Sequence, residues 1–146
     1  MSSTIVVHLV DHPNTPVARH SILPQGTAPG SKPLAAAINI LPAIRSGGPH
    51  LLIASNRDLC RETGDTVALF RLDDDGAMKL LRHLEVPARH LRGVAVDAEN
   101  RWVCVAGRHG GGIVVLERVC EDGLDLAIRA TLPDVKQVIA PMWVEL

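Results

Sequence analysis

The side chains best suited to chemistry are two arginines and a histidine that stand beside apolar runs. Arg57 comes shortly after one such run, and His90 and Arg92 come just before another. Arginine binds a phosphate or carboxylate through two parallel hydrogen bonds and can stabilise a developing oxyanion. Histidine, with an ordinary pKa near 6.5, can activate water for ester opening or move a proton. These residues predict a catalytic site in which Arg57 and Arg92 bind an anionic substrate and His90 is the acid or base.

Each of these residues also has a purely structural interpretation. Arg57, His90 and Arg92 would then only hydrogen-bond to carbonyl groups of neighbouring loops. Asn56, which precedes Arg57, would either donate to a substrate carbonyl as a substrate-binding residue or cap a turn. The residue types by themselves leave these alternatives open.

Two further motifs favour structure over chemistry. His8 and His12 have the spacing of metal ligands on a helix, but the β-type residues and the proline beside them argue against a helix, so no metal site is predicted. The glycine-rich segment 107–112 lacks the Lys-Ser/Thr ending of a phosphate-binding loop. It predicts a tight turn between two strands, in which Arg108 and His109 add positive charge.

The composition predicts one globular domain that has neither nucleic acid nor a membrane as its partner. The 146 residues carry 15 basic and 16 acidic side chains, a formal charge of −1, and 2% aromatic residues. That balance disfavours polyanion binding, and so few rings disfavour base stacking. The sequence shows no apolar run of membrane-spanning length, no signal sequence and no Cys-x-x-Cys pair. We therefore expect a cytoplasmic protein with reduced thiols.

Short apolar runs bounded by turn residues predict strands along most of the chain. The segment Leu34–Leu41 contains three alanines, but prolines on both sides leave it too short for a normal helix, so we predict a strand. The sequence Asp73–Gly76 is typical of a turn and predicts a hairpin between its flanking strands. The other clear strands are Ile5–Val10, Leu51–Ala54, Thr66–Leu72 and Met78–Val86.

An internal repeat organises these strands. The first unit consists of Ile38–Ile40, Leu51–Ala54, Thr66–Arg71 and the turn Asp75–Gly76. The second consists of Val94–Val96, Trp102–Ala106, Ile113–Arg118 and the turn Asp122–Gly123. Units of about 40–50 residues with four short strands are typical of β-propeller blades.

The repeat predicts an all-β fold, an open partial β-propeller with about three blades of four-stranded antiparallel sheet in a single domain. Residues 1–33 would end one blade and add a loop, residues 34–87 and 88–133 would form two blades, and residues 134–146 would supply the first strand of a closing blade, at Trp143–Leu146. Propellers close with about four to eight blades, so this chain cannot close alone. Its open blade edges predict self-association between copies.

The sequence motifs of the repeat resemble those of a known family. Ala54–Arg57 followed by Thr66–Asp73 and Gly76, then His90-Leu91-Arg92, and finally Ala140–Val144 stand in the order found in lactonase-type seven-bladed β-propellers. That family includes the bacterial 6-phosphogluconolactonase of propeller type and the fungal carboxy-cis,cis-muconate cyclase. The resemblance covers the C-terminal portion of the family's chain.

The resemblance implies a lactone-metabolising enzyme with a small anionic lactone or carboxylate as its substrate. Hydrolysis of a sugar lactone, as by 6-phosphogluconolactonase, is the first expectation, and a muconate cyclase-type isomerase is the alternative. In the cyclase branch, an arginine at the motif of Arg57 belongs to the proposed site. Neither activity implies a metal or organic cofactor. A non-catalytic interaction module is a further alternative. Because more than half of the family's usual length is absent, we expect this chain alone to be truncated and inactive.

Overall fold

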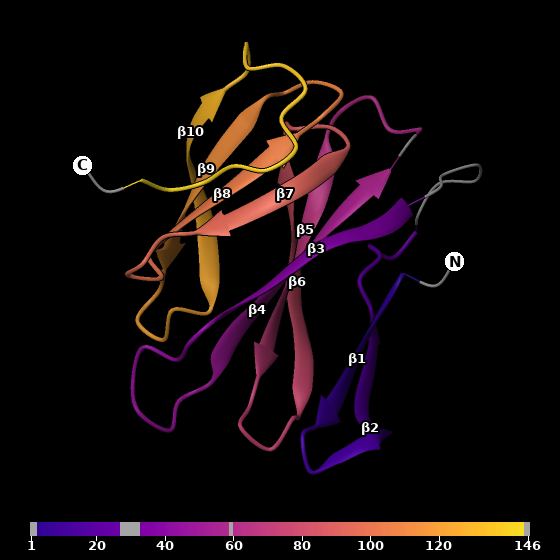
Figure 1. Ribbon diagram of the computed structural model, residues 1–146, viewed down its shortest axis with the longest axis vertical. Coiled ribbons are helices and arrows are strands. Elements are labelled where there is room, and N and C mark those ends of the chain that lie inside the picture. The colour runs from indigo at the N-terminus through magenta and orange to yellow at the C-terminus, as the bar shows by residue number, and fades with distance from the viewer. Residues whose placement is uncertain (1–2, 27–32, 59, 145–146) are drawn as a thin grey trace.

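The computed structural model describes residues 3–26, 33–58 and 60–144, and these residues form ten β-strands and no helix. The described residues therefore contain no helix that could cross a membrane. Figure 1 shows the strands arranged as sheets that lie side by side, none of them closed into a barrel. The predicted fold class, an open partial β-propeller, is confirmed.

Three antiparallel sheets make up the described part of the chain, and in each the strands pair in chain order. The first sheet is a hairpin of β1 (Thr4–Leu9) and β2 (His12–Ser21). The second contains β3 (Pro33–Leu41), β4 (His50–Asp58), β5 (Asp65–Leu72) and β6 (Met78–Val86). The third contains β7 (Leu91–Val96), β8 (Trp102–Gly107), β9 (Ile113–Val119) and β10 (Asp125–Leu132).

The second sheet is buried on both faces, which explains the nearly continuous apolar runs of β4 and β5. Successive side chains on a strand point to opposite faces. Leu51 and Ile53 pack against the third sheet, in a cluster that includes Val105 of β8. Leu52 and Phe70 pack against the hairpin instead. The second sheet therefore lies between its two neighbours as a blade does in a propeller.

Polar contacts supplement this apolar packing between the sheets. Arg82 of β6 donates to the Asp125 carboxylate at 2.7 Å and to the Leu126 carbonyl oxygen at 2.8 Å, which joins the second sheet to the third. His83 of β6 contacts the Ile22 carbonyl oxygen at 2.9 Å, which joins the second sheet to the end of the hairpin. These contacts help to hold the second sheet against both of its neighbours.

The C-terminal segment differs from its prediction. Trp143 and Val144 belong to no strand, and the last two residues of the predicted strand lie outside the described residues. Trp143 donates from Nε1 to the Ala95 carbonyl oxygen at 3.3 Å, and a Cβ on Gly93 would lie 2.5 Å from the Ile139 carbonyl oxygen. The segment therefore runs across β7 (Figure 1). A strand requires a hydrogen-bonded ladder beside it, and no described strand of a further blade supplies one.

Candidate functional site

The structure brings Arg57, His90 and Arg92 together at one end of the second and third sheets. Arg57 lies near the end of β4, His90 directly precedes β7, and Arg92 is the second residue of β7. Arg92 donates from Nε to His90 Nε2 at 3.1 Å. The positive charges of Arg57 and Arg92 both act on the His90 ring. The three residues are therefore neighbours in space, as the catalytic interpretation requires, while their roles stay a prediction.

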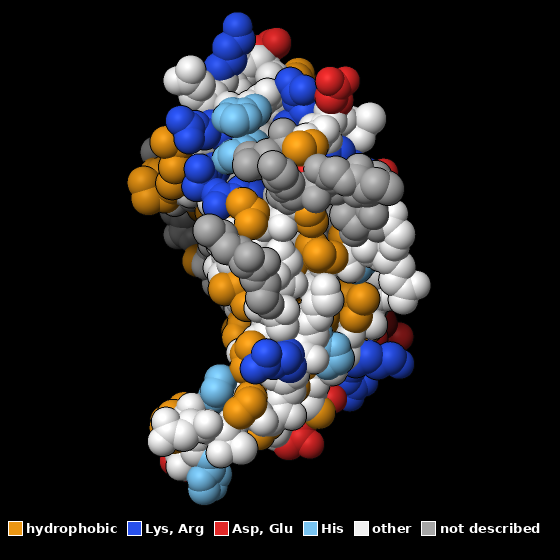
Figure 2. Space-filling view, turned by 90° about the vertical axis from the view of Figure 1, so that its right-hand side faces the viewer, with side chains coloured by type: hydrophobic (Ala, Val, Ile, Leu, Met, Phe, Trp, Pro, Cys, Tyr) orange, Lys and Arg blue, Asp and Glu red, His pale blue; other side chains and the backbone are white. Residues whose placement is uncertain are grey.

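The loop between β8 and β9 adds two residues to this group. The imidazole of His109 stacks on that of His90, with ring centroids 4.1 Å apart and an angle of 30° between the planes. Arg108 precedes it and contributes a further positive charge near His90. We call Arg57, His90, Arg92, Arg108 and His109 the arginine–histidine cluster. Figure 2 shows basic and histidine side chains gathered near the upper end of the molecule.

Glycines let the β8–β9 loop approach the segment before β7 closely. The Arg89 amide donates to the Gly110 carbonyl oxygen at 2.8 Å, and the Arg108 amide donates to the His90 carbonyl oxygen at 3.2 Å. Gly111 has a φ of +70°, and a Cβ there would lie 2.2 Å from the Pro87 carbonyl oxygen. The segment is a turn between two strands, as predicted, and its glycines are what bring the loop against His90.

Burial and positive charge keep His90 neutral. The side chain is only 6% exposed. Burial first, and then the positive charges of His109, Arg92, Arg57 and Arg108, lower the pKa of His90 from 6.5 to about 4. Burial and the neighbouring arginines also lower the pKa of Arg92. At neutral pH the imidazole of His90 is therefore uncharged.

The hydrogen bond from Arg92 fixes the tautomer of His90. An arginine Nε always donates, so His90 Nε2 must accept and the single proton of the neutral ring lies on Nδ1. His90 Nδ1 and Arg57 Nε are both buried, and neither finds a hydrogen-bond partner among the described residues. Buried donors without a partner are rare and cost about 1–3 kcal/mol each. The cluster therefore has two donors for which the described residues supply no acceptor.

Asn56 does not join the cluster, although it precedes Arg57 in the sequence. Its Nδ2 donates to the Ile22 carbonyl oxygen at 2.6 Å and to Thr66 Oγ1 at 3.3 Å. Asn56 and Arg57 are consecutive residues of β4, so their side chains point to opposite faces of the sheet. The structure thus places Asn56 against the end of the hairpin rather than beside His90.

Asp65 is the important residue that the sequence analysis missed. It is the first residue of β5 and is 2% exposed. Its carboxylate accepts hydrogen bonds from the backbone amides of Asp58 at 2.9 Å and Leu91 at 3.0 Å. The sequence would have pointed to Asp65 only if the start of β5 were known to be buried, and the sequence does not show burial.

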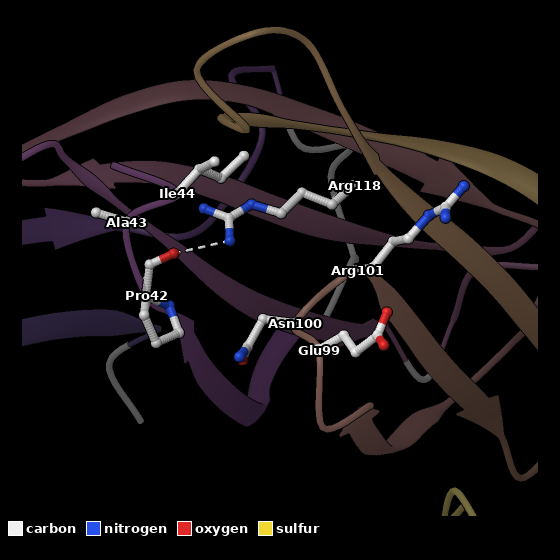
Figure 3. Close-up of a pocket in the computed structure, with 7 residues that line it drawn as sticks. All are labelled: Pro42, Ala43, Ile44, Glu99, Asn100, Arg101 and Arg118. Atoms are coloured by element: carbon white, nitrogen blue, oxygen red, sulfur yellow. Dashed lines mark hydrogen bonds between the residues drawn. The ribbon is translucent and has the colours of Figure 1, made fainter. Parts of the chain in front are cut away.

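A separate cavity of about 410 Å³ lies at the opposite end of β7 and is lined by residues 42–44, 99–101 and Arg118 (Figure 3). Arg118 donates from Nη1 to the Pro42 carbonyl oxygen at 2.7 Å and from Nε to the Gly123 carbonyl oxygen at 2.6 Å. These bonds link the loop after β3 to the turn before β10. Arg118 is therefore a structural contact between two blades. Among the described residues no cluster of histidine, cysteine and acidic side chains is suited to hold a metal ion.

The lowered pKa of His90 predicts a loss of stability in mild acid. Between pH 6.5 and pH 4 the unfolded chain binds a proton at this histidine while the folded chain does not, so the free energy of unfolding decreases as the pH falls. Thermal unfolding measured in steps from pH 7 to pH 4 should show a larger decrease in Tm for the wild type than for His90→Gln. Parallel curves for the two proteins would contradict this assignment.

A family model described as "Lactonase, 7-bladed beta-propeller" matches residues 1–144. The sequence has no match among curated proteins.

Solved structures share the fold at low sequence identity. A protein from Lactobacillus plantarum superposes with a TM-score of 0.74 at 20% identity, over 95% of this chain and 38% of that chain. A "putative 6-phosphogluconolactonase" from Bacteroides fragilis gives 0.69 at 19% identity, over 95% and 35%. A periplasmic gluconolactonase from Pseudomonas aeruginosa gives 0.68 at 20% identity, over 93% and 35%. This chain therefore spans little more than a third of the length of these structures.

Proposed function

Since the chain belongs to the lactonase family of seven-bladed β-propellers, we propose that its arginine–histidine cluster binds the acidic group of a sugar lactone and promotes hydrolysis of the lactone ring. Two of the similar structures are named for lactonases that act on gluconolactone or its 6-phosphate. Those names support a sugar lactone as the substrate class.

The observation that carries the proposal is the pair of unpartnered donors in a positively charged site. His90 Nδ1 and Arg57 Nε are buried and lack acceptors among the described residues. An oxygen-rich anion supplies acceptors for both donors and offsets the charge of the three arginines. A lactone that bears a phosphate or carboxylate has such an anion, together with a carbonyl oxygen that can accept as well.

Hydrolysis would use the cluster to stabilise negative charge. Hydroxide adds to the lactone carbonyl carbon, the carbonyl oxygen becomes an oxyanion, and the ring C–O bond then breaks to leave a carboxylate and an alcohol. Donors aimed at the oxyanion lower the barrier to the addition step. His90 would serve as a neutral donor through Nδ1, since Arg92 occupies its lone pair. This role replaces that of an acid or base.

The alternative of muconate cyclisation has less support. That reaction requires a group that transfers a proton, and His90 has a pKa near 4 and no free lone pair. Binding of the carboxylates of a muconate by the arginines would be unaffected. The geometry therefore favours lactone opening over cyclisation.

Calorimetric titration of the chain with 6-phosphogluconate, the product of the proposed hydrolysis, tests the binding step. We expect 6-phosphogluconate to bind, with an affinity that decreases as the salt concentration increases, and glucose not to bind. Equal binding of both compounds, or of neither, would contradict the proposal.

Lactone hydrolysis by the same preparation tests the chemical step. The proposal predicts acid release from glucono-1,5-lactone 6-phosphate above the uncatalysed rate, and this result would overturn the expectation, drawn from chain length, that this chain alone is inactive. Binding of 6-phosphogluconate without hydrolysis would support the non-catalytic module instead.

A further inference from the structure

We propose that Asp65 is a positioning residue for the arginine–histidine cluster: its buried carboxylate ties the end of β4 to the segment before β7 and so sets the geometry of Arg57, His90 and Arg92. This inference rests on the proposed function of the cluster. Asp65 itself contacts none of the ligand-binding donors and acts only through the backbone.

The contacts of Asp65 fall on residues that flank the cluster. Oδ1 accepts from the amide of Asp58, the residue after Arg57, at 2.9 Å. Oδ2 accepts from the amide of Leu91, which stands between His90 and Arg92, at 3.0 Å. The backbone amide of Asp65 also donates to the Ala88 carbonyl oxygen at 3.0 Å. One side chain thus connects the two segments that supply the predicted site residues.

The backbone conformation of His90 explains why such a tie is needed. His90 has a φ of +56°, which lies in the left-handed region of backbone conformation. Residues other than glycine adopt that region at a cost in free energy. Such a conformation persists only where surrounding contacts hold it. The backbone amides of His90 and Leu91 both bond to the Asp65 carboxylate, so these bonds lie at the strained residue itself.

The chemistry of the tie suits a carboxylate rather than an amide. Burial raises the pKa of Asp65, and the backbone amides of Asp58, Leu91 and His90 oppose that shift. A carboxylate offers two accepting oxygens to these donors, whereas the asparagine amide has one oxygen and turns an NH2 group toward a backbone N–H. Asp65→Asn therefore preserves size and removes part of the tie.

The test compares Asp65→Asn with a matched control, Asp125→Asn. Asp125 also begins a strand and accepts from a backbone amide and an arginine, but at the far end of the third sheet. Inorganic phosphate is titrated into the wild type and each variant, and the His90 imidazole is followed by 15N–1H correlation spectra. We expect Asp65→Asn to bind phosphate about tenfold more weakly, as befits one lost hydrogen bond. The pKa of His90 should also move back toward 6.5, because burial is the main cause of its shift.

The outcomes separate this inference from the proposed function. A folded Asp65→Asn chain with wild-type phosphate affinity and an unchanged His90 spectrum would overturn the positioning role. The same changes in Asp125→Asn would also overturn it, since a general loss of stability would then explain them. If the wild type fails to bind phosphate, the proposed function fails, and the His90 spectrum alone decides the role of Asp65.

Discussion

Replacing Phe70 with alanine is expected to cost about 3–5 kcal/mol of stability, because Phe70 is the largest fully buried side chain among the described residues. Phe70 lies in β5, is completely buried and faces the hairpin. It packs with Ile5 and Ile22, and its ring meets that of His20 edge to face at a centroid distance of 6.0 Å. Native domains are stable by only about 5–15 kcal/mol, so most of the margin would be lost.

Urea unfolding followed by circular dichroism measures this loss. The matched control is Val10→Ala, because Val10 is 94% exposed and its replacement should change the free energy of unfolding by less than about 0.5 kcal/mol. A small effect of Phe70→Ala would mean that the hairpin is not docked on the second sheet, which would contradict the described packing between these two sheets.

Replacing Arg57 and Arg92 together with methionine is expected to weaken binding of 6-phosphogluconate about 100-fold, since each charge-assisted hydrogen bond is worth roughly tenfold in affinity. Methionine retains much of the length of the side chain without its charge. Stability should be unchanged or increased, because burial, and after it the neighbouring positive charges of Arg57 and Arg108, already disfavour the charged form of Arg92. Loss of binding with an unchanged Tm would separate a ligand-binding role from a structural one.

Calorimetry and thermal unfolding of the double variant make this comparison, with Arg129→Met as the control. Arg129 pairs with Glu117 on the third sheet and is exposed, so its loss should leave the affinity near that of the wild type. Wild-type affinity in the double variant would show that the anion binds elsewhere. A large decrease in Tm together with weaker binding would return both arginines to the structural interpretation.

The repeat and the strands were predictable because they depend on local spacing. The two-sided burial of β4 and β5 produces nearly continuous apolar runs, and turn residues such as Gly76 mark their ends. The segment from 34 to 41 was predicted as a strand because prolines bracket it, and β3 occupies it. The proximity of Arg57 to His90 followed from the same repeat, because the end of one blade's second strand meets the start of the next blade.

Contacts between segments distant in the chain decided the remainder. Because β4 continues to Asp58, Asn56 and Arg57 both belong to it and lie on opposite faces of the sheet. The glycine-rich loop places the ring of His109 on that of His90. The contacts of the Asp65 carboxylate with the backbone amides of Asp58 and Leu91 also appear only in the folded chain. The sequence by itself determined a propeller-type chain with a basic site between two blades, because strand burial and turn formation are local. Only the tertiary structure decided that His90 is neutral with its proton on Nδ1, because its pKa and its tautomer result from burial, from nearby charges and from the hydrogen bond with Arg92.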